Sequence, residues 1–137
     1  MTFLAERLAE LRKHVDHLYE IRPHVRGPES LERNLSLHND VLFSLLTVAQ
    51  LVIDIAGELN TRKGTPFDDY TTAVRNLIRL GSFPDALVER LARLPGFRNV
   101  LLHEYVDLDY AIVIEAMNDL EPVEDFVRIV ARLEASE

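Results

Sequence analysis

Residues 29–59 read ESLERNLSLHNDVLFSLLTVAQLVIDIAGEL, which is the longest helical pattern in the chain. Its side chains follow the spacing of three or four residues that marks one face of an α-helix. The stripe comprises Leu31, Leu35, His38, Val41, Leu42, Leu45, Ala49, Val52, Ile53 and Ala56. Further apolar residues widen it at Leu46, Val48, Leu51 and Ile55. We therefore predict one long helix over about 29–59 that is central in a bundle or also a subunit contact.

Helical patterns separated by proline and glycine fill the rest of the chain. A first helix is marked by the apolar stripe Leu4, Leu8, Leu11, Val15 and Leu18, with Thr2 as a possible N-cap. Pro23 and Gly27-Pro28 should end it, and residues 60–66 have the composition of a loop. Shorter helices are predicted over 67–80, 84–94, 109–118 and 122–135, with Pro95-Gly96 restarting the chain before another helix.

No segment shows the alternation of a β-strand. The pattern therefore predicts an all-α protein, an antiparallel bundle of four main helices plus short ones, with a single domain over residues 1–137. The two-sided apolar surface of the long helix favours a homodimer.

The composition excludes several classes of protein. The net charge of −8 argues against a protein that coats DNA or RNA, although a local basic groove would still allow action on RNA. The absence of cysteine excludes disulfides and Cys-ligated metal sites, which fits the cytoplasmic location that we expect. The longest apolar run is broken by Gln50 and Asp54, so we expect no membrane span.

Residues 98–105, RNVLLHEY, combine an anion-binding guanidinium, an imidazole and a phenol within two helical turns. On a regular helix Tyr105 would lie about 20° from Arg98, with Asn99 about 100° and His103 about 140° round the axis. These polar residues can share one face, but that face is wide for a single small site. Either the helix ends near His103 or a second copy of the face completes the site.

Several other polar residues could have either a structural or a functional role. Asp54 interrupts an apolar run, so it forms a structural ion pair, lies at an exposed edge, or helps to position Arg98 or His103. His14 and His17 are three residues apart but do not complete a set of metal ligands, and His38 is expected to be a core histidine. Glycine loops for nucleotides and nucleophile motifs are absent, so we expect neither a metal nor a cofactor.

Residues 95–105, PGFRNVLLHEY, followed by Leu108-Asp109, resemble the signature of the HepT-like proteins, which belong to the HEPN superfamily. That signature is Arg-x4-His-x-Tyr preceded by Gly-Phe-Arg-Asn, and each of its positions is filled here. Residues 53–56, IDIA, also resemble the family's second-helix pattern. Pro95 is a small departure that removes no functional group.

The resemblance implies the toxin of a two-gene toxin–antitoxin pair that acts as a metal-independent ribonuclease. Arg98 and His103 would be the catalytic residues, with Asn99 and Asp54 in support, and two copies of the motif would meet across the cleft of a homodimer. The implied antitoxin is a minimal nucleotidyltransferase of the MntA type, which would silence the toxin by attaching AMP to Tyr105. Neither DNA nor a membrane is implied as a partner.

Two other functions fit the same residues. The chain could be a non-catalytic helical partner of a nucleotidyltransferase, with the motif binding nucleotide phosphates or presenting substrate. It could also be a plain helical interaction module, in which loss of both Arg98 and His103 would change neither binding nor toxicity. The RNA target and the geometry of the dimer are not determined by the sequence.

Overall fold

The computed structural model describes residues 2–136, so the ends of the predicted domain, residues 1 and 137, lie outside the described part. All regular elements of the described residues are helical, η denoting a 3-10 helix. They are α1 (Phe3–Ile21), η1 (Arg22–His24), α2 (Pro28–Arg33), α3 (Leu35–Arg62), α4 (Tyr70–Arg75), η2 (Asn76–Leu80), α5 (Asp85–Leu91), α6 (Leu94–His103), α7 (Tyr110–Met117) and α8 (Glu121–Ala135). The predicted all-α class is confirmed.

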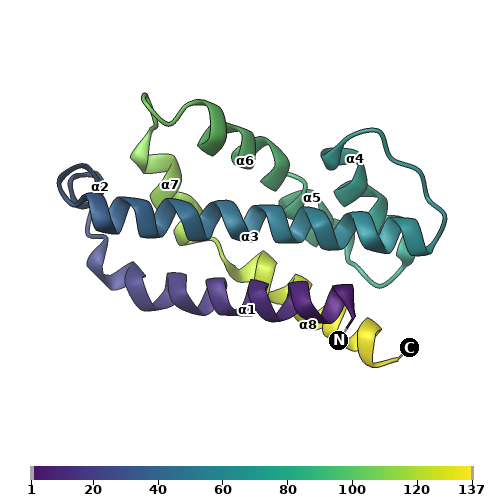
Figure 1. The fold of residues 1–137 in the computed structure, drawn as a ribbon. Coiled ribbons are helices and arrows are strands. Elements are labelled where there is room, and N and C mark those ends of the chain that lie inside the picture. Colours follow the sequence, from purple (N-terminus) through teal and green to yellow (C-terminus); the bar gives the residue numbers. More distant parts are fainter. Residues whose placement is uncertain (1, 137) are drawn as a thin grey trace.

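Helix α3 forms the axis of the bundle (Figure 1). Helix α1 runs antiparallel to it on one side, α6 lies along the other side, and α8 packs beside α1. The N- and C-termini lie at the same end of the bundle, whereas the α6–α7 connection lies at the opposite end, near the start of α3. The antiparallel bundle expected from the apolar pattern is therefore confirmed.

The α1 stripe is buried as predicted, at Leu4, Leu8, Leu11, Val15 and Leu18. Each such aliphatic side chain contributes about 1.5–3 kcal/mol when it leaves water. The N-cap is also confirmed, because the Thr2 hydroxyl accepts a hydrogen bond from the Ala5 amide at 3.1 Å.

The single helix predicted over 29–59 is wrong at Asn34. There the backbone is extended (φ −121°, ψ 97°), so α2 ends and α3 begins at this residue. Asn34 Oδ1 accepts the Leu37 amide at 3.0 Å and thereby caps α3. Because the break turns the helix, Leu35 is 70% exposed although it belongs to the predicted stripe. Helix α3 also continues past residue 59, to Arg62.

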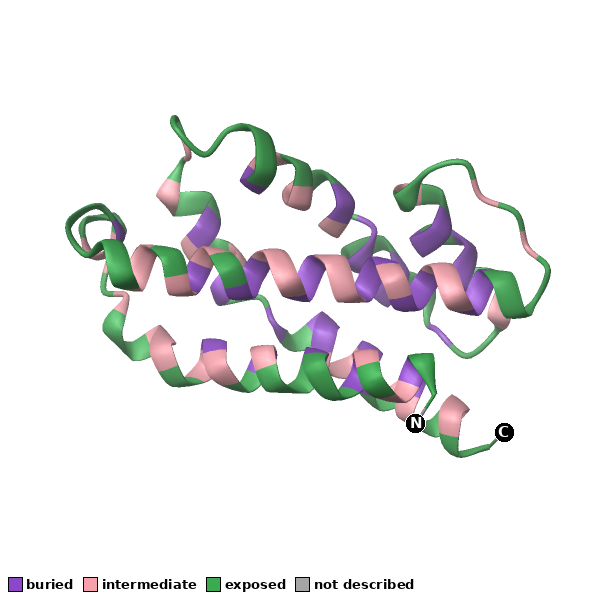
Figure 2. Cartoon of the chain, in the orientation of Figure 1, coloured by how far each residue is buried: buried purple, intermediate pink, exposed green. Residues whose placement is uncertain are grey.

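The apolar surface of α3 is explained largely by its central position. By length and composition alone α3 would be able to cross a membrane, but half of its most apolar window is buried inside the bundle. The colours of Figure 2 show that buried turns alternate along α3 with half-buried and exposed ones. Phe43 remains 62% exposed, so the helix also presents apolar surface outward.

The helix predicted over 67–80 is shorter and changes type. It begins only at Tyr70, because Asp69 caps it by accepting the Thr72 amide at 2.7 Å, and it tightens into η2 at Asn76. Gly81 ends this segment with a φ of +79°, a left-handed conformation that glycine adopts without strain. The next predicted helix, over 84–94, is α5 and covers only Asp85–Leu91.

A buried pair of asparagines ties this segment to α3. The Asn60 amide donates to the carbonyls of Ala56 at 2.6 Å and Ala73 at 2.8 Å. Asn76 Nδ2 donates to Asn60 Oδ1 at 2.8 Å and to the Pro66 carbonyl at 3.1 Å. These bonds satisfy polar groups that are out of water, and they fix α4 against the C-terminal half of α3.

Candidate functional site

Helix α6 carries the motif and lies along α3 (Figure 1). It begins at Leu94, with Pro95 in its first turn, where a missing amide hydrogen costs nothing. The chain does restart before this helix, but at Ala92 and Arg93 and not at Pro95-Gly96, which lie inside the first turn of α6. Leu101 is buried and anchors the helix, while Phe97 and Val100 are half-buried beside it.

Arg98 is held by groups from three parts of the fold. Its Nε–H donates to Oε1 of Gln50 on α3, and its Nη1 donates to Asn99 Oδ1 at 2.9 Å. Its Cζ lies 5.5 Å from the ring centroid of Tyr70, the first residue of α4. Hydrogen bonds therefore restrain the guanidinium at Nε and at Nη1, and the Tyr70 ring restrains it from a third side.

Asp54 reaches this arginine through Gln50. Gln50 Nε2 donates to Asp54 Oδ1 at 2.8 Å, one helical turn along α3. Because a carboxylate only accepts, Asp54 orients the Gln50 amide so that its oxygen faces Arg98. Asp54 thus lies in the same hydrogen-bonded chain as Arg98, and among the described residues it makes no hydrogen bond or ion pair with His103.

His103 is the last residue of α6 and is exposed. The width of the motif face left two arrangements open. The structure shows the first of them, in which the helix ends at His103. Asn99 Oδ1 accepts a hydrogen bond from Arg98 Nη1, so Asn99 helps to orient the arginine side chain.

The placement of Tyr105 on the same helical face as Arg98 is wrong. Glu104 caps α6, and residues 104–109 are not helical. Tyr105 lies in this connection with 67% of its surface exposed, beside Val106 at 81%. The phenol is therefore open to solvent, whereas Arg98 is only partly exposed against α3.

Two residues of this site were not predicted from the sequence. Gln50 was visible only as a polar interruption of the apolar run, which indicates a constraint but not a partner. Tyr70 carried no signal, because its contact with Arg98 joins positions 28 residues apart that only the packing of α4 beside α6 brings together.

Three of the other histidines make contacts within the bundle. His14 Nδ1 lies 3.1 Å from the Ser44 hydroxyl, and burial lowers the pKa of His14 below 6.5. His17 Nε2 lies 2.7 Å from Asp40 Oδ1. His38 is half-buried and meets the edge of the Tyr110 ring, so it is less enclosed than a core histidine.

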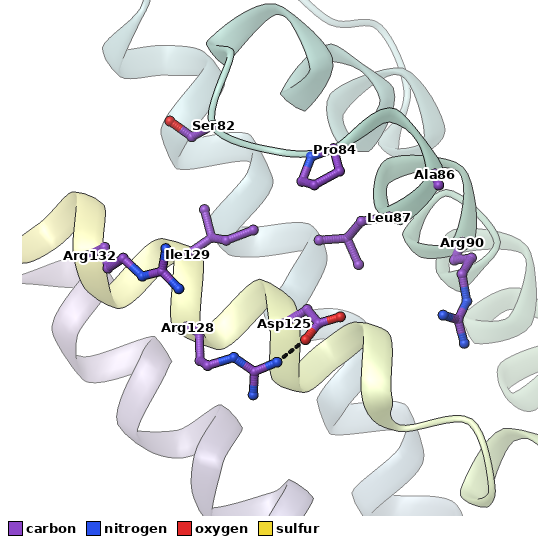
Figure 3. A pocket seen from close by; sticks show the side chains of 9 residues that line it. All are labelled: Ser82, Pro84, Ala86, Leu87, Arg90, Asp125, Arg128, Ile129 and Arg132. Carbon is purple, nitrogen blue, oxygen red and sulfur yellow. Dashed lines mark hydrogen bonds and ion pairs between the residues drawn. The ribbon is translucent and has the colours of Figure 1, made fainter.

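A hollow of about 480 Å³ lies between α5 and α8, away from the motif residues (Figure 3). Three arginines line it around Leu87 and Ile129. Two of them are already paired with carboxylates, Arg90 with Asp119 and Arg128 with Asp125. Because these ion pairs neutralise much of its charge, the hollow is a weaker candidate for an anion site than Arg98.

Comparison with known proteins agrees with this fold. The profile of the ribonuclease HepT-like family matches residues 5–130. The chain therefore belongs to the HepT-like family. A relative from Shewanella oneidensis, the mRNA nuclease HepT, is 26% identical over 105 residues, which cover 72% of this chain and 76% of that protein. A relative from Archaeoglobus fulgidus is 31% identical over 81 residues, and this match spans 61% of its length.

Solved structures show the same fold. One is the tri-AMPylated Shewanella oneidensis HEPN toxin in complex with an MNT antitoxin, with a TM-score of 0.81 at 20% identity, covering 96% of this chain and 99% of that one. Another is a toxin–antitoxin complex with AMP-PNP, with a TM-score of 0.82 at 18% identity, covering 94% and 97%. At these identities the likeness concerns the fold alone.

Proposed function

We propose that this chain is the toxin of a toxin–antitoxin pair and that it cleaves RNA without a metal ion through Arg98 and His103. The geometry of Arg98 carries this proposal. Gln50 and Asn99 occupy its Nε and one Nη1 hydrogen, and its Nη2 makes no hydrogen bond to a described residue. Nη2 and the second Nη1 hydrogen thus remain as donors for a phosphate, which a guanidinium can bind in a bidentate manner. Family membership supports the same assignment.

The chemistry requires one proton to be removed and another to be supplied. A base takes the proton from the ribose 2′-hydroxyl, the 2′-oxygen attacks phosphorus, and an acid protonates the departing 5′-oxygen. An imidazole serves in either role near neutral pH, and Arg98 offsets the charge that develops on the phosphate. The products are a 2′,3′-cyclic phosphate and a 5′-hydroxyl.

A homodimer would provide two imidazoles, one as the base and one as the acid. Exposed apolar side chains at one end of the bundle support such a dimer: Leu35, Phe43, Leu102, Val106 and Ile112. They come from the N-terminal half of α3 and from the region of α6 and α7 beside it (Figure 1). Exposed apolar surface of this kind favours a protein contact.

The test of the catalytic assignment compares His103→Ala with the parent in RNA cleavage and in growth arrest. We expect at least a hundredfold loss of cleavage, because general acid–base groups contribute about 10²–10⁴-fold. His24→Ala is the matched control, since His24 is also exposed but lies in η1. Equal activity of His103→Ala and the parent would show that the assignment is wrong.

We propose further that Tyr105 accepts AMP from a nucleotidyltransferase of the MntA type. Its exposed phenol in the α6–α7 connection, two residues after His103, is accessible to a second enzyme. An AMP group there would add negative charge next to the catalytic imidazole and repel RNA phosphates. The AMPylated state of the similar Shewanella oneidensis toxin supports this regulation.

Mass spectrometry after incubation with the nucleotidyltransferase and ATP tests the acceptor. Tyr105→Phe should gain no AMP, whereas Tyr110→Phe, which removes a half-buried phenol, should be modified like the parent. Unchanged modification of Tyr105→Phe would rule out this role.

A further inference from the structure

Tyr70 has an aromatic side chain that is partly exposed to solvent and lies next to Arg98. It is the first residue of α4, and 46% of its surface is exposed. The Arg98 guanidinium lies 5.5 Å from its ring centroid. The guanidinium lies over one side of the ring, and the exposed part of Tyr70 remains open to solvent next to the group to which we assign phosphate binding.

The segment that carries Tyr70 is tied to the rest of the fold. The buried bonds of Asn60 and Asn76 fix the segment around α4 to α3, and Asp69 caps α4 at Tyr70. Arg98 is fixed independently by Gln50. The backbone of Tyr70 and the side chain of Arg98 are therefore both tied to α3, which lowers the entropy lost when one ligand contacts both.

We propose that Tyr70 stacks the nucleobase adjacent to the phosphate on Arg98, so that the substrate is unpaired, single-stranded RNA. This inference rests on the proposed ribonuclease function and specifies its substrate class. A separation of 5.5 Å lets a single nucleotide contact both groups. Bases of a duplex are stacked on each other and are out of reach of such a ring, whereas the bases of a single strand can be splayed onto it.

The charge of the protein makes this contact important. With a net charge of −8, the chain cannot hold RNA by general attraction to its phosphates. Base stacking is insensitive to that charge and tolerates any base, because every base has a flat face. Stacking at Tyr70 therefore adds affinity where the electrostatics of the whole protein oppose it.

The experiment measures binding in the His103→Ala background, so that RNA stays intact. Two fluorescein-labelled probes are compared by anisotropy: a single-stranded RNA, and a sugar–phosphate strand of equal length that lacks bases. Tyr70→Leu should bind the RNA about tenfold more weakly and leave binding of the baseless strand unchanged. Tyr70→Phe, which keeps the ring, and Ile78→Ala, which removes another exposed side chain of the same segment, should match the background.

Three results would overturn the inference. Equal losses for both probes would mean that Tyr70 only buttresses Arg98. A loss accompanied by a lower solution mass would make the ring a subunit contact, and no loss would mean that it does not touch RNA. If the parent neither binds nor cleaves RNA, the proposed function fails as well; if the parent cleaves RNA and only the Tyr70 effect is missing, the stacking site alone is wrong.

Discussion

Gln50 offers the sharpest test of how Arg98 is positioned. Gln50→Leu keeps the approximate size of the side chain and the helix, but it removes both the acceptor for Arg98 Nε–H and the donor to Asp54. A hydrogen bond to a charged group contributes about 1.5–3 kcal/mol. Since Gln50 and Arg98 are both partly exposed, water replaces some of that bond, and we take the lower end. We therefore expect kcat/KM for RNA cleavage to fall about tenfold.

The assay is a double-mutant cycle on RNA cleavage. Gln50→Leu should lower kcat/KM in the parent and have no further effect in an Arg98→Ala background, because the group that it positions is then missing. Thr47→Val is the matched control, since its hydroxyl bonds the Phe43 carbonyl on the same helix and does not contact Arg98. The same fold loss in both backgrounds, or no loss in the parent, would refute the positioning role.

Three further predictions concern stability and assembly. Asn60→Leu should lower the free energy of unfolding in urea by about 2–4 kcal/mol, because it leaves buried partners unsatisfied, whereas the exposed Thr61→Ala should change it by less than about 1 kcal/mol. Because burial lowers the pKa of His14, the unfolded chain binds its proton first as the pH falls; stability should be complete above about pH 6.5 and decline below it, less steeply in His14→Gln. Phe43→Asp should reduce the solution mass toward that of a monomer by placing a charge on the proposed dimer surface, whereas Phe3→Asp, at the other end of the bundle, should not.

The main features of the fold follow from local apolar periodicity. The stripe of α1 and the central position of α3 are visible in the sequence because burial repeats with the helical period. The break at Asn34 is not visible, because the apolar spacing continues across it while the side chain itself caps the next helix. Similarly, the helical period left open whether the motif helix ends near His103, and only the structure shows that it does, so that Tyr105 does not share the face of Arg98.

The residues of the site are only partly predictable for a different reason. Arg98, Asn99 and His103 are neighbours in sequence, so their types and spacing suggest one function. Gln50 and Tyr70 come from other helices, and their contacts with Arg98 depend on how α3, α4 and α6 pack. Local patterns contain no information on such pairs until the packing is known.

We propose that this chain cleaves RNA by attack of the 2′-hydroxyl, without a metal. The most direct measurement is the end-group chemistry of RNA incubated with the purified protein in EDTA. The proposal predicts fragments with 2′,3′-cyclic phosphate and 5′-hydroxyl ends, and their absence with His103→Ala. Intact RNA, or fragments that form only when a divalent metal is added and carry 3′-hydroxyl ends, would contradict it.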